Sequence, residues 1–353
     1  MLKTSRYHMR KLLLPALLAA VLAAGCAKSP QEGPNDSEIR YFESWIISQR
    51  AKHPEYLWKE TSLGSYILED EPGYGALVGD SDATPYVNVS YIITDLQGNI
   101  LQSSEEADAR RLGSFSSGSY YGPRTVYRGE GGCTAGENDL MTGMKVGGTR
   151  KAVVPGWLLS SARYDSASDY MKVSSKGTSA IFTISLDDAF TDVVKWQIDS
   201  LERTVRRMYP SASLDTTGMY GFYYYQLTPP SDADAVMDDG AKFDVNYTGF
   251  LLNGHIFDST DEILSKDNNL SEKTSYGPTY ITWNEDYQEI TMGSDSASPI
   301  LGFAYALSKM KPGEKGVAFF YSNLGYQYNG SEPTIPPYCP LAFELEMVGA
   351  HSD

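Results

Sequence analysis

The sequence predicts an α+β protein in which one folding unit, built on an antiparallel sheet, occurs twice. Three observations favour this fold class. Strand-like runs such as FYYYQL, GVAFFYS and LAFELEMV outnumber helix-like ones. A single short helix-like run in each half is suited to cover one face of a sheet. Motifs in the first half also recur, in the same order, in the second half.

The internal repeat rests on two pairs of motifs. They are YIITDLQGNILQSS (91–104) with YTGFLLNGHIFDST (247–260), and MKVGGTRKAVV (144–154) with MKPGEKGVAFF (310–320). In both copies a glycine lies eight residues before the methionine that opens the second motif. We therefore expect one domain at 37–190 and a second at 191–353.

The N-terminal residues predict export and a membrane anchor. Four basic residues precede the run LLLPALLAAVLAAGC, whose apolar part is shorter than the roughly 20 residues that a spanning helix needs. The run resembles a bacterial lipoprotein signal, which implies a signal peptide at 1–25, lipidation of Cys26 and a polar tether at 26–36. The expected location is the cell envelope, lipid-anchored at the outer membrane and facing the periplasm or the surface. An ordinary secretory signal with a chance cysteine is the alternative.

Composition limits the partners and cofactors. The chain has 45 acidic and 29 basic residues, a formal net charge of −16, which weighs against nucleic acid as a partner. The four histidines are isolated and no cysteine pair has ligand spacing, so we expect no metal and no cofactor. Cys133 and Cys339 fall in different halves, and we expect both to be free and buried.

A helix is expected before each sheet, at 38–52 and at 191–208. The second has apolar residues spaced four and three apart, which predicts one buried face: Val194, Ile198, Leu201, Val205 and Met208. Arginines at its C-terminal end suit the helix dipole, so no binding role is assigned to them.

Turns and loops follow from local residue types. Asn253-Gly254 predicts a tight hairpin turn. The run ILGFAYALSKM, ended by Pro312-Gly313, predicts the short helix of the second copy, with an apolar face of Ile300, Phe303, Leu307 and Met310. The Gly-, Ser- and Tyr-rich stretch 112–132 predicts a long surface loop in the first copy.

Three motifs of the second copy together resemble the FKBP-type peptidyl-prolyl cis/trans isomerases. They are VNYTGFLLNGHIFDST, PILGFAYALSKMKPGEKGVAFFYSNLGY and IPPYCPLAFELEMV, in that order. The resemblance implies two FKBP-like domains, each a twisted antiparallel sheet wrapped around a short helix. It also implies that the second domain isomerises Xaa-Pro bonds in proline-containing polypeptides, without a cofactor.

By motif position, the resemblance implies five catalytic residues: Tyr247, Phe257, Asp258, Tyr326 and Phe343. Three more residues would contact the substrate: Ile300, Phe303 at the family's usual tryptophan position, and Ile335 in an Ile-Pro-Pro loop. The segment 261–293 departs from the family motifs and contributes no predicted site residue. From the residues alone, Asp258 either lines a pocket or caps a turn, and the aromatic residues either line a pocket or fill a core.

These residue types suit the implied reaction. Rotation about an Xaa-Pro bond faces a barrier of about 18–20 kcal/mol, because the planar amide loses resonance. No nucleophile is needed if the enzyme binds the twisted amide better than the planar one in a dry aromatic pocket. Tyr326 could donate a hydrogen bond to a substrate carbonyl. Asp258 would place a negative charge beside the carbonyl carbon or hold a neighbouring tyrosine in position.

The first copy differs at the same positions. It has Leu101, Gln102, Glu137 and Ser160 where the second has Phe257, Asp258, Phe303 and Tyr326. A buried Glu137 would be costly unless it is paired, so we expect no isomerase activity from this copy. It would serve as a chaperone-like domain or as a spacer. For the whole chain, the alternative is a non-catalytic surface lipoprotein that binds peptide or glycan on an FKBP-like scaffold.

Overall fold

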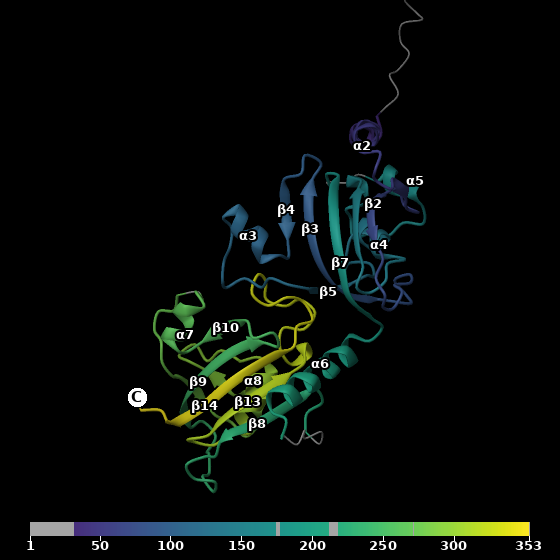
Figure 1. Ribbon diagram of the computed structural model, residues 1–353. Helices are drawn as coiled ribbons and strands as arrows, with labels where there is room; N and C mark the ends of the chain where they lie inside the picture. The colour runs from purple at the N-terminus through teal and green to yellow at the C-terminus, as the bar shows by residue number, and fades with distance from the viewer. Residues whose placement is uncertain (1–31, 174–176, 212–217, 271, 353) are drawn as a thin grey trace, which may run out of the picture.

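The computed structural model describes residues 32–352 except 174–176, 212–217 and 271. The predicted signal peptide and Cys26 lie outside these residues. The described chain forms two antiparallel sheets, one from each half, at opposite ends of an elongated molecule (Figure 1). None of the helices within these residues is long and apolar enough to cross a membrane.

The first sheet has seven strands: six follow the order β1-β2-β6-β7-β3-β4, and β5 pairs with β3. In chain order its strands are β1 (Lys59–Glu60), β2 (Tyr66–Glu71), β3 (Tyr86–Asp95), β4 (Ile100–Ser103), β5 (Arg124–Tyr127), β6 (Thr149–Val154) and β7 (Ala180–Phe190). The helices of this half are α2 (Asp36–Lys52), α3 (Glu106–Leu112), α4 (Ala135–Met141), η1 (Gly156–Leu158) and α5 (Ala167–Lys172).

The second sheet has the order β12-β11-β9-β14-β13-β8, and β10 pairs with β9. Its strands are β8 (Phe222–Thr228), β9 (Lys242–Leu251), β10 (Ile256–Ser259), β11 (Thr279–Thr282), β12 (Thr291–Met292), β13 (Lys315–Phe320) and β14 (Leu341–Ala350). The helices are α6 (Val193–Met208), α7 (Glu262–Asp267), η2 (Tyr287–Glu289), α8 (Leu301–Ser308) and η3 (Ser322–Leu324).

The repeat predicted from sequence is present in the strand pairing. The order β2-β6-β7-β3-β4 of the first sheet has its counterpart in β8-β13-β14-β9-β10 of the second. Tyr91 of β3 lies opposite Ile184 of β7. Its repeat partner, Tyr247 of β9, lies opposite Leu345 of β14. The register therefore matches as well as the strand order, and the predicted fold class is confirmed.

The hairpin turn is also shared by the two copies. Gly98 and Gly254 have φ angles of 90° and 92°, in the left-handed region that glycine enters without strain. In the second copy, the side-chain oxygen of Asn253 accepts a hydrogen bond from the backbone N–H of His255 at 3.0 Å. The predicted turn at Asn253-Gly254 is confirmed, and it fixes the pairing of β9 with β10.

Helices cover both faces of the second sheet. On one face, Phe303 and Leu307 of α8 are buried against alternate residues of β13 and β14. On the other face, Leu201 and Val205 of α6 are buried against the intervening residues of the same strands. The predicted apolar face of α6 is therefore right at its centre but wrong at Met208, which is 43% exposed as the last residue of the helix.

The first sheet is likewise preceded by a helix. Phe42 and Ile46 are the buried residues of α2. The ring of Phe42 lies 5.4 Å from that of Trp157 and 6.3 Å from that of Tyr66, measured between centroids. An additional helix before each sheet agrees with the prediction.

The connection between the copies is short and well packed. Strand β7 ends at Phe190 and α6 begins at Val193. The Trp196 ring stacks on the Phe190 ring with a centroid distance of 4.6 Å and an interplanar angle of 8°. The Trp196 indole N–H also donates a hydrogen bond to Asp188 at 2.7 Å. Helix α6 therefore leaves the first sheet in a fixed direction.

The stretch 112–132 is not simply the surface loop that its composition predicts. It contains β5, and it continues to Arg128, whose side chain is fully buried. The Arg128 guanidinium donates hydrogen bonds to the backbone carbonyls of Gly79, Asp80 and Thr84 at 2.8–3.3 Å. A buried cation is tolerated when most of its donors are satisfied in this way, and here only Nε finds no partner among the described residues. The surface-loop prediction was wrong for this part because a Gly- and Tyr-rich composition does not reveal a strand pairing.

Cys133 and Cys339 are free thiols, as predicted. Cys133 is buried, as predicted, whereas Cys339 is only half-buried. Burial, together with the nearby charge of Glu137, raises the pKa of the Cys133 thiol to about 11. This thiol is therefore protonated near neutral pH, which makes it a poor nucleophile.

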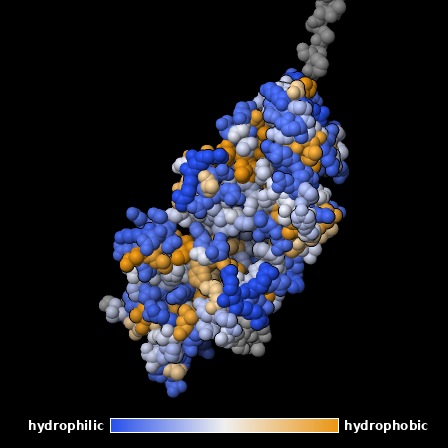
Figure 2. Space-filling model, in the orientation of Figure 1, coloured by the Kyte–Doolittle hydropathy of each residue, from blue (hydrophilic) through white to orange (hydrophobic). Residues whose placement is uncertain are grey.

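The molecular face in Figure 2 is largely hydrophilic, and its apolar residues are scattered in small patches. The tyrosines of β8 are not part of an exposed aromatic surface. Tyr223 is buried, Tyr224 donates a hydrogen bond to Glu314 at 2.7 Å, and Tyr225 stacks on Tyr209 at 4.5 Å. The described structure therefore does not present these tyrosines as a stacking platform for a sugar.

Candidate active site in the second sheet

All eight predicted pocket residues line one cavity of about 610 Å³ in the second copy. They are Tyr247, Phe257, Asp258, Ile300, Phe303, Tyr326, Ile335 and Phe343. They come from β9, β10, the start of α8, the segment after η3 and β14. Residues far apart in sequence are therefore brought to one place by the curvature of the sheet around α8.

The floor of this cavity is aromatic and buried. Phe303 and Phe343 are only 3% and 4% exposed, and their rings meet edge to face with centroids 5.1 Å apart. Tyr247 meets Phe303 edge to face at 5.4 Å, and Phe257 meets Phe343 in the same way at 5.4 Å. Edge-to-face contacts of this kind hold the rings in fixed orientations.

A glycine allows the rings to lie against the backbone of the sheet. A Cβ atom on Gly249 of β9 would lie 2.6 Å from atoms of Phe257 and 2.8 Å from an atom of Phe343. Real Cβ atoms do not approach other atoms so closely, so any side chain here would displace both rings. Gly249 therefore helps to set the depth of the cavity.

The helix α8 presents its apolar face to this floor, as predicted. Ile300 is the N-cap residue, and its backbone carbonyl accepts the hydrogen bonds of Phe303 and Ala304 at 3.0 and 3.1 Å. Phe303, Leu307 and Met310 are buried, while Ile300 is half-buried at the cavity wall. The start of the helix therefore places one aliphatic and one aromatic side chain in the cavity.

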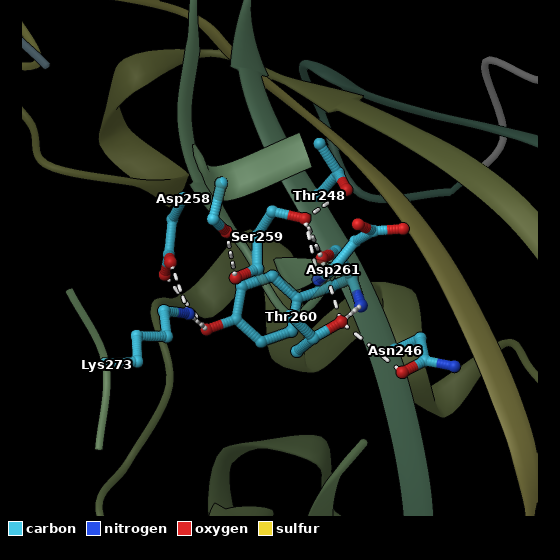
Figure 3. Close-up of polar contacts among 9 residues, drawn as sticks. Asn246, Thr248, Asp258, Ser259, Thr260, Asp261 and Lys273 are labelled. Carbon is cyan, nitrogen blue, oxygen red and sulfur yellow. Dashed lines mark hydrogen bonds and ion pairs between the residues drawn. The ribbon is translucent and has the colours of Figure 1, made fainter. Parts of the chain in front are cut away.

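One wall of the cavity is polar. The phenol of Tyr247 donates a hydrogen bond to Oδ2 of Asp258 at 2.9 Å. Lys273 approaches Oδ1 of the same carboxylate at 2.6 Å, as Figure 3 shows, and its Nζ lies 5.1 Å from the centroid of the Tyr247 ring. Asp258 and Lys273 keep 39% and 29% of their side-chain surface exposed, so solvent screens this ion pair.

The phenols near Asp258 remain protonated. Burial raises the pKa of Tyr247 above its ordinary value, and the charge and hydrogen bond of Asp258 raise it further. Burial and the Asp258 charge also raise the pKa of Tyr326. Both hydroxyls therefore keep their protons over the physiological pH range. Tyr247 uses its proton in the hydrogen bond to Asp258, and Tyr326 is left with a hydroxyl that can donate to a ligand.

Asp258 lies in the cavity and does not cap the bend that follows it. That bend is stabilised by Ser259, whose hydroxyl accepts a hydrogen bond from the backbone N–H of Asp261 at 3.1 Å. Asp261 in turn caps α7 by accepting from the N–H of Leu264 at 2.8 Å. Of the two alternatives that the residues leave open, the cavity is the one observed.

Several lining residues were missed by the motif comparison. They are Leu270, Glu272, Lys273, Met292, Ser298, Pro299, Ser331 and Thr334. Lys273 is the most consequential because it is the cation beside Asp258. No local signal identifies it, because it lies in the segment 261–293, which matches no family motif. The chain brings Lys273 to the cavity only after it has passed through α7.

The first copy shows a different arrangement at the corresponding helix. Glu137 was expected at the floor of a poor pocket, but its carboxylate turns back and accepts hydrogen bonds from the backbone N–H and the hydroxyl of Thr134, both at 2.8 Å. Thr134 and Glu137 thus form a capping box at the start of α4. This pairing avoids the cost of an unpaired buried carboxylate, and Leu101, which replaces Phe257, is 59% exposed.

Comparisons with known proteins agree with the geometry. Residues 234–348 match the family model described as FKBP-type peptidyl-prolyl cis-trans isomerase. The macrophage infectivity potentiator of Trypanosoma cruzi is 29% identical over 107 residues, which are 30% of this chain and 42% of that protein. The Arabidopsis thaliana peptidyl-prolyl cis-trans isomerase FKBP15-1 is 29% identical over 124 residues, which are 35% of this chain and 66% of that protein.

A solved structure also aligns with part of the chain. It is a peptidyl-prolyl cis-trans isomerase from Pseudomonas syringae pv. tomato, 23% identical, with a TM-score of 0.31, and the alignment covers 46% of this chain and all of that one. The fold and the aromatic cavity define the C-terminal half as an α+β domain with a ligand-sized site. The region that matches the FKBP-type peptidyl-prolyl cis-trans isomerase model, residues 234–348, contains all the residues that line this site.

Proposed function

We propose that the protein is a peptidyl-prolyl cis/trans isomerase that acts on Xaa-Pro bonds of exported polypeptides through the cavity of its second copy. The observation that supports this most is the convergence of five aromatic rings and one polar wall on a single cavity of about 610 Å³. A prolyl ring would occupy the aromatic floor. The relatives matched here extend beyond the matched region, so activity is a proposal for this chain.

The proposed mechanism uses binding energy alone. The barrier of about 18–20 kcal/mol reflects amide resonance, which water stabilises in the planar state. The rings of Phe303 and Phe343 would exclude water from the bound imide. The planar amide would then lose more of its stabilisation by water than the twisted amide does, and the barrier to rotation would fall. No group of the protein has to form a bond with the substrate.

The polar wall would orient the substrate. Tyr326, kept protonated by its surroundings, would donate a hydrogen bond to a substrate carbonyl. Asp258 would face the carbonyl carbon, which gains positive character relative to the nitrogen as the amide twists. Tyr247 and Lys273 hold the Asp258 carboxylate from two sides, which supports a positioning role for both.

For the first copy we propose a non-catalytic role. The Glu137 carboxylate is engaged in the capping box of α4, and Gln102 replaces the Asp258 carboxylate. Together with Leu101 and Ser160, these differences remove the acid and three of the aromatic residues from the corresponding positions. Within this proposal, the first copy contributes to the protein through packing and not through chemistry.

We also propose that Cys26 carries a lipid that anchors the protein in the cell envelope, on the strength of the N-terminal sequence alone. Mass spectrometry of the N-terminal peptide from purified protein should then show acylated Cys26. The Cys26→Ser variant should move from the membrane fraction to the soluble fraction. An unmodified cysteine on a secreted protein would favour an ordinary signal peptide.

The isomerase proposal is tested with a short Xaa-Pro peptide whose cis and trans forms are followed by exchange NMR. We expect turnover by the purified protein and its loss in Phe257→Ala. Tyr74→Ala is the matched aromatic control, because Tyr74 is fully exposed in the first copy. A wild-type protein that binds the peptide without accelerating the exchange would favour the non-catalytic binding alternative.

A further inference from the structure

Residues 326–338, here called the rim loop, form one side of the candidate active site. Tyr326, Ser331, Thr334 and Ile335 of this loop line the cavity. The loop is closed by its own backbone: Ser331 and Ile335 exchange two hydrogen bonds of 2.8 Å, and Tyr338 donates to the carbonyl of Gln327 at 3.1 Å. Its position therefore sets the width of the cavity on this side.

The outer side of the rim loop is held by the first copy. The carbonyl of Pro333 accepts a hydrogen bond from the backbone N–H of Tyr120 at 2.8 Å. Arg124 forms an ion pair with Glu332. Figure 1 shows the loop, in yellow, reaching toward β5. The first copy thus contacts the loop at Glu332 and Pro333, which do not line the cavity.

A third contact holds the end of the rim loop. The Tyr338 ring meets the Tyr86 ring of β3 edge to face, with centroids 5.6 Å apart and an interplanar angle of 76°. Tyr86 also stacks on Phe190 at 6.0 Å. The loop is therefore fastened at its tip and at its C-terminal end by the same neighbouring sheet.

The residues that hold the loop are themselves fixed to that sheet. Arg124 belongs to β5 and lies opposite Val89 of β3. Its guanidinium also donates to the carbonyl of Tyr120 at 3.4 Å, and the Tyr120 hydroxyl donates to the carbonyl of Pro123 at 2.8 Å. The contacts therefore connect the rim loop to a strand and not to a freely moving segment.

We infer that the first copy is a clamp that positions the rim loop, with Arg124 as a positioning residue for substrate binding at the second copy. This inference rests on the proposed isomerase function. Arg124 touches the loop and not the cavity, whereas the aromatic floor and the polar wall are held within the second copy. Loosening the clamp should weaken binding of planar and twisted substrate alike, which raises KM and leaves kcat nearly unchanged.

The test uses the full-length protein and the Arg124→Ala variant. We expect KM for the Xaa-Pro peptide to rise about threefold, as befits a partly exposed ion pair, with kcat within a factor of about two. Hydrogen–deuterium exchange at the amides of 331–338 should become faster. Arg40→Ala is the matched control, because it also removes an exposed arginine–glutamate ion pair from the first copy. That pair joins Arg40 of α2 to Glu32 at 3.1 Å.

A charge exchange distinguishes positioning from general destabilisation. Arg124→Glu alone should raise KM more than Arg124→Ala, and adding Glu332→Arg should return both KM and amide exchange toward wild type. If Arg124→Ala leaves KM and exchange at wild-type values in an active protein, the clamp is refuted and the isomerase proposal stands. If the wild-type protein lacks activity, the isomerase proposal fails, and unchanged exchange in the rim loop would then refute the clamp independently.

Discussion

The Tyr247 hydroxyl and the Asp258 carboxylate, on neighbouring strands β9 and β10, are joined by a hydrogen bond of 2.9 Å, and Lys273 approaches the same carboxylate from the other side. We expect Asp258→Ala to lower kcat/KM about tenfold, because Tyr247 and Lys273 both lose their partner and the substrate loses the adjacent charge. Peptide exchange NMR measures this. Asp267→Ala, which removes an exposed carboxylate from α7, is the control and should retain full activity.

The close approach of Gly249 to two rings leads to a second prediction. Gly249→Ala should lower the free energy of unfolding by about 1–3 kcal/mol, because the added methyl displaces Phe257 and Phe343. It should also reduce activity by reshaping the floor. The control is Gly349→Ala on β14, where an added Cβ meets nothing within 4 Å and stability should change by about 0.5 kcal/mol or less. Urea unfolding of both variants decides between these outcomes, and equal stabilities would contradict the prediction.

The capping box of α4 predicts a purely structural role for Glu137. Thr134→Ala should cost about 1 kcal/mol of stability, since the start of the helix loses the side chain that accepts the Glu137 N–H at 3.2 Å. Isomerase activity should be unchanged, because the first copy is not catalytic in our proposal. Thermal unfolding followed by circular dichroism gives the stability, and Glu43→Ala, an exposed residue of α2, is the comparison. A loss of activity without a loss of stability would assign chemistry to the first copy.

His255 predicts a pH dependence of stability. Burial lowers its pKa, although a hydrogen bond with the Gly118 backbone opposes the shift, and its ring lies 6.3 Å from that of Tyr120. The folded state therefore binds a proton less readily than the unfolded chain. The stabilisation is fully present above the unfolded pKa of about 6.5 and is lost as pH falls through the folded-state pKa. Between pH 7 and pH 5, His255→Asn should show a smaller fall in Tm than wild type, and an equal fall in both proteins would contradict the prediction.

Much of the second copy could be predicted from the sequence because its signals are local or match known motifs. The Asn253-Gly254 turn and the apolar face of α8 each follow from a few adjacent residues, and the structure has both. The eight cavity residues were placed by their motif positions. Their convergence in one cavity is observed, while their catalytic roles stay predictions.

The remaining features depend on contacts between distant segments. Lys273 reaches Asp258 by the path of a segment without a motif, and β5 exists because Arg124 to Tyr127 pair with β3. Arg128 is buried only because three backbone carbonyls surround it. Composition could not reveal these pairings, since the same Gly-, Ser- and Tyr-rich residues are equally compatible with an exposed loop.

The short passage from Phe190 to Val193 has a consequence for how the two halves can diverge. Because each residue of an α-helix turns by about 100°, inserting or deleting one residue there would rotate Leu201 and Val205 away from the sheet that they cover. A change of length at this joint would therefore have to be compensated if α6 is to keep both its packing on the second sheet and the stacking of Trp196 on Phe190.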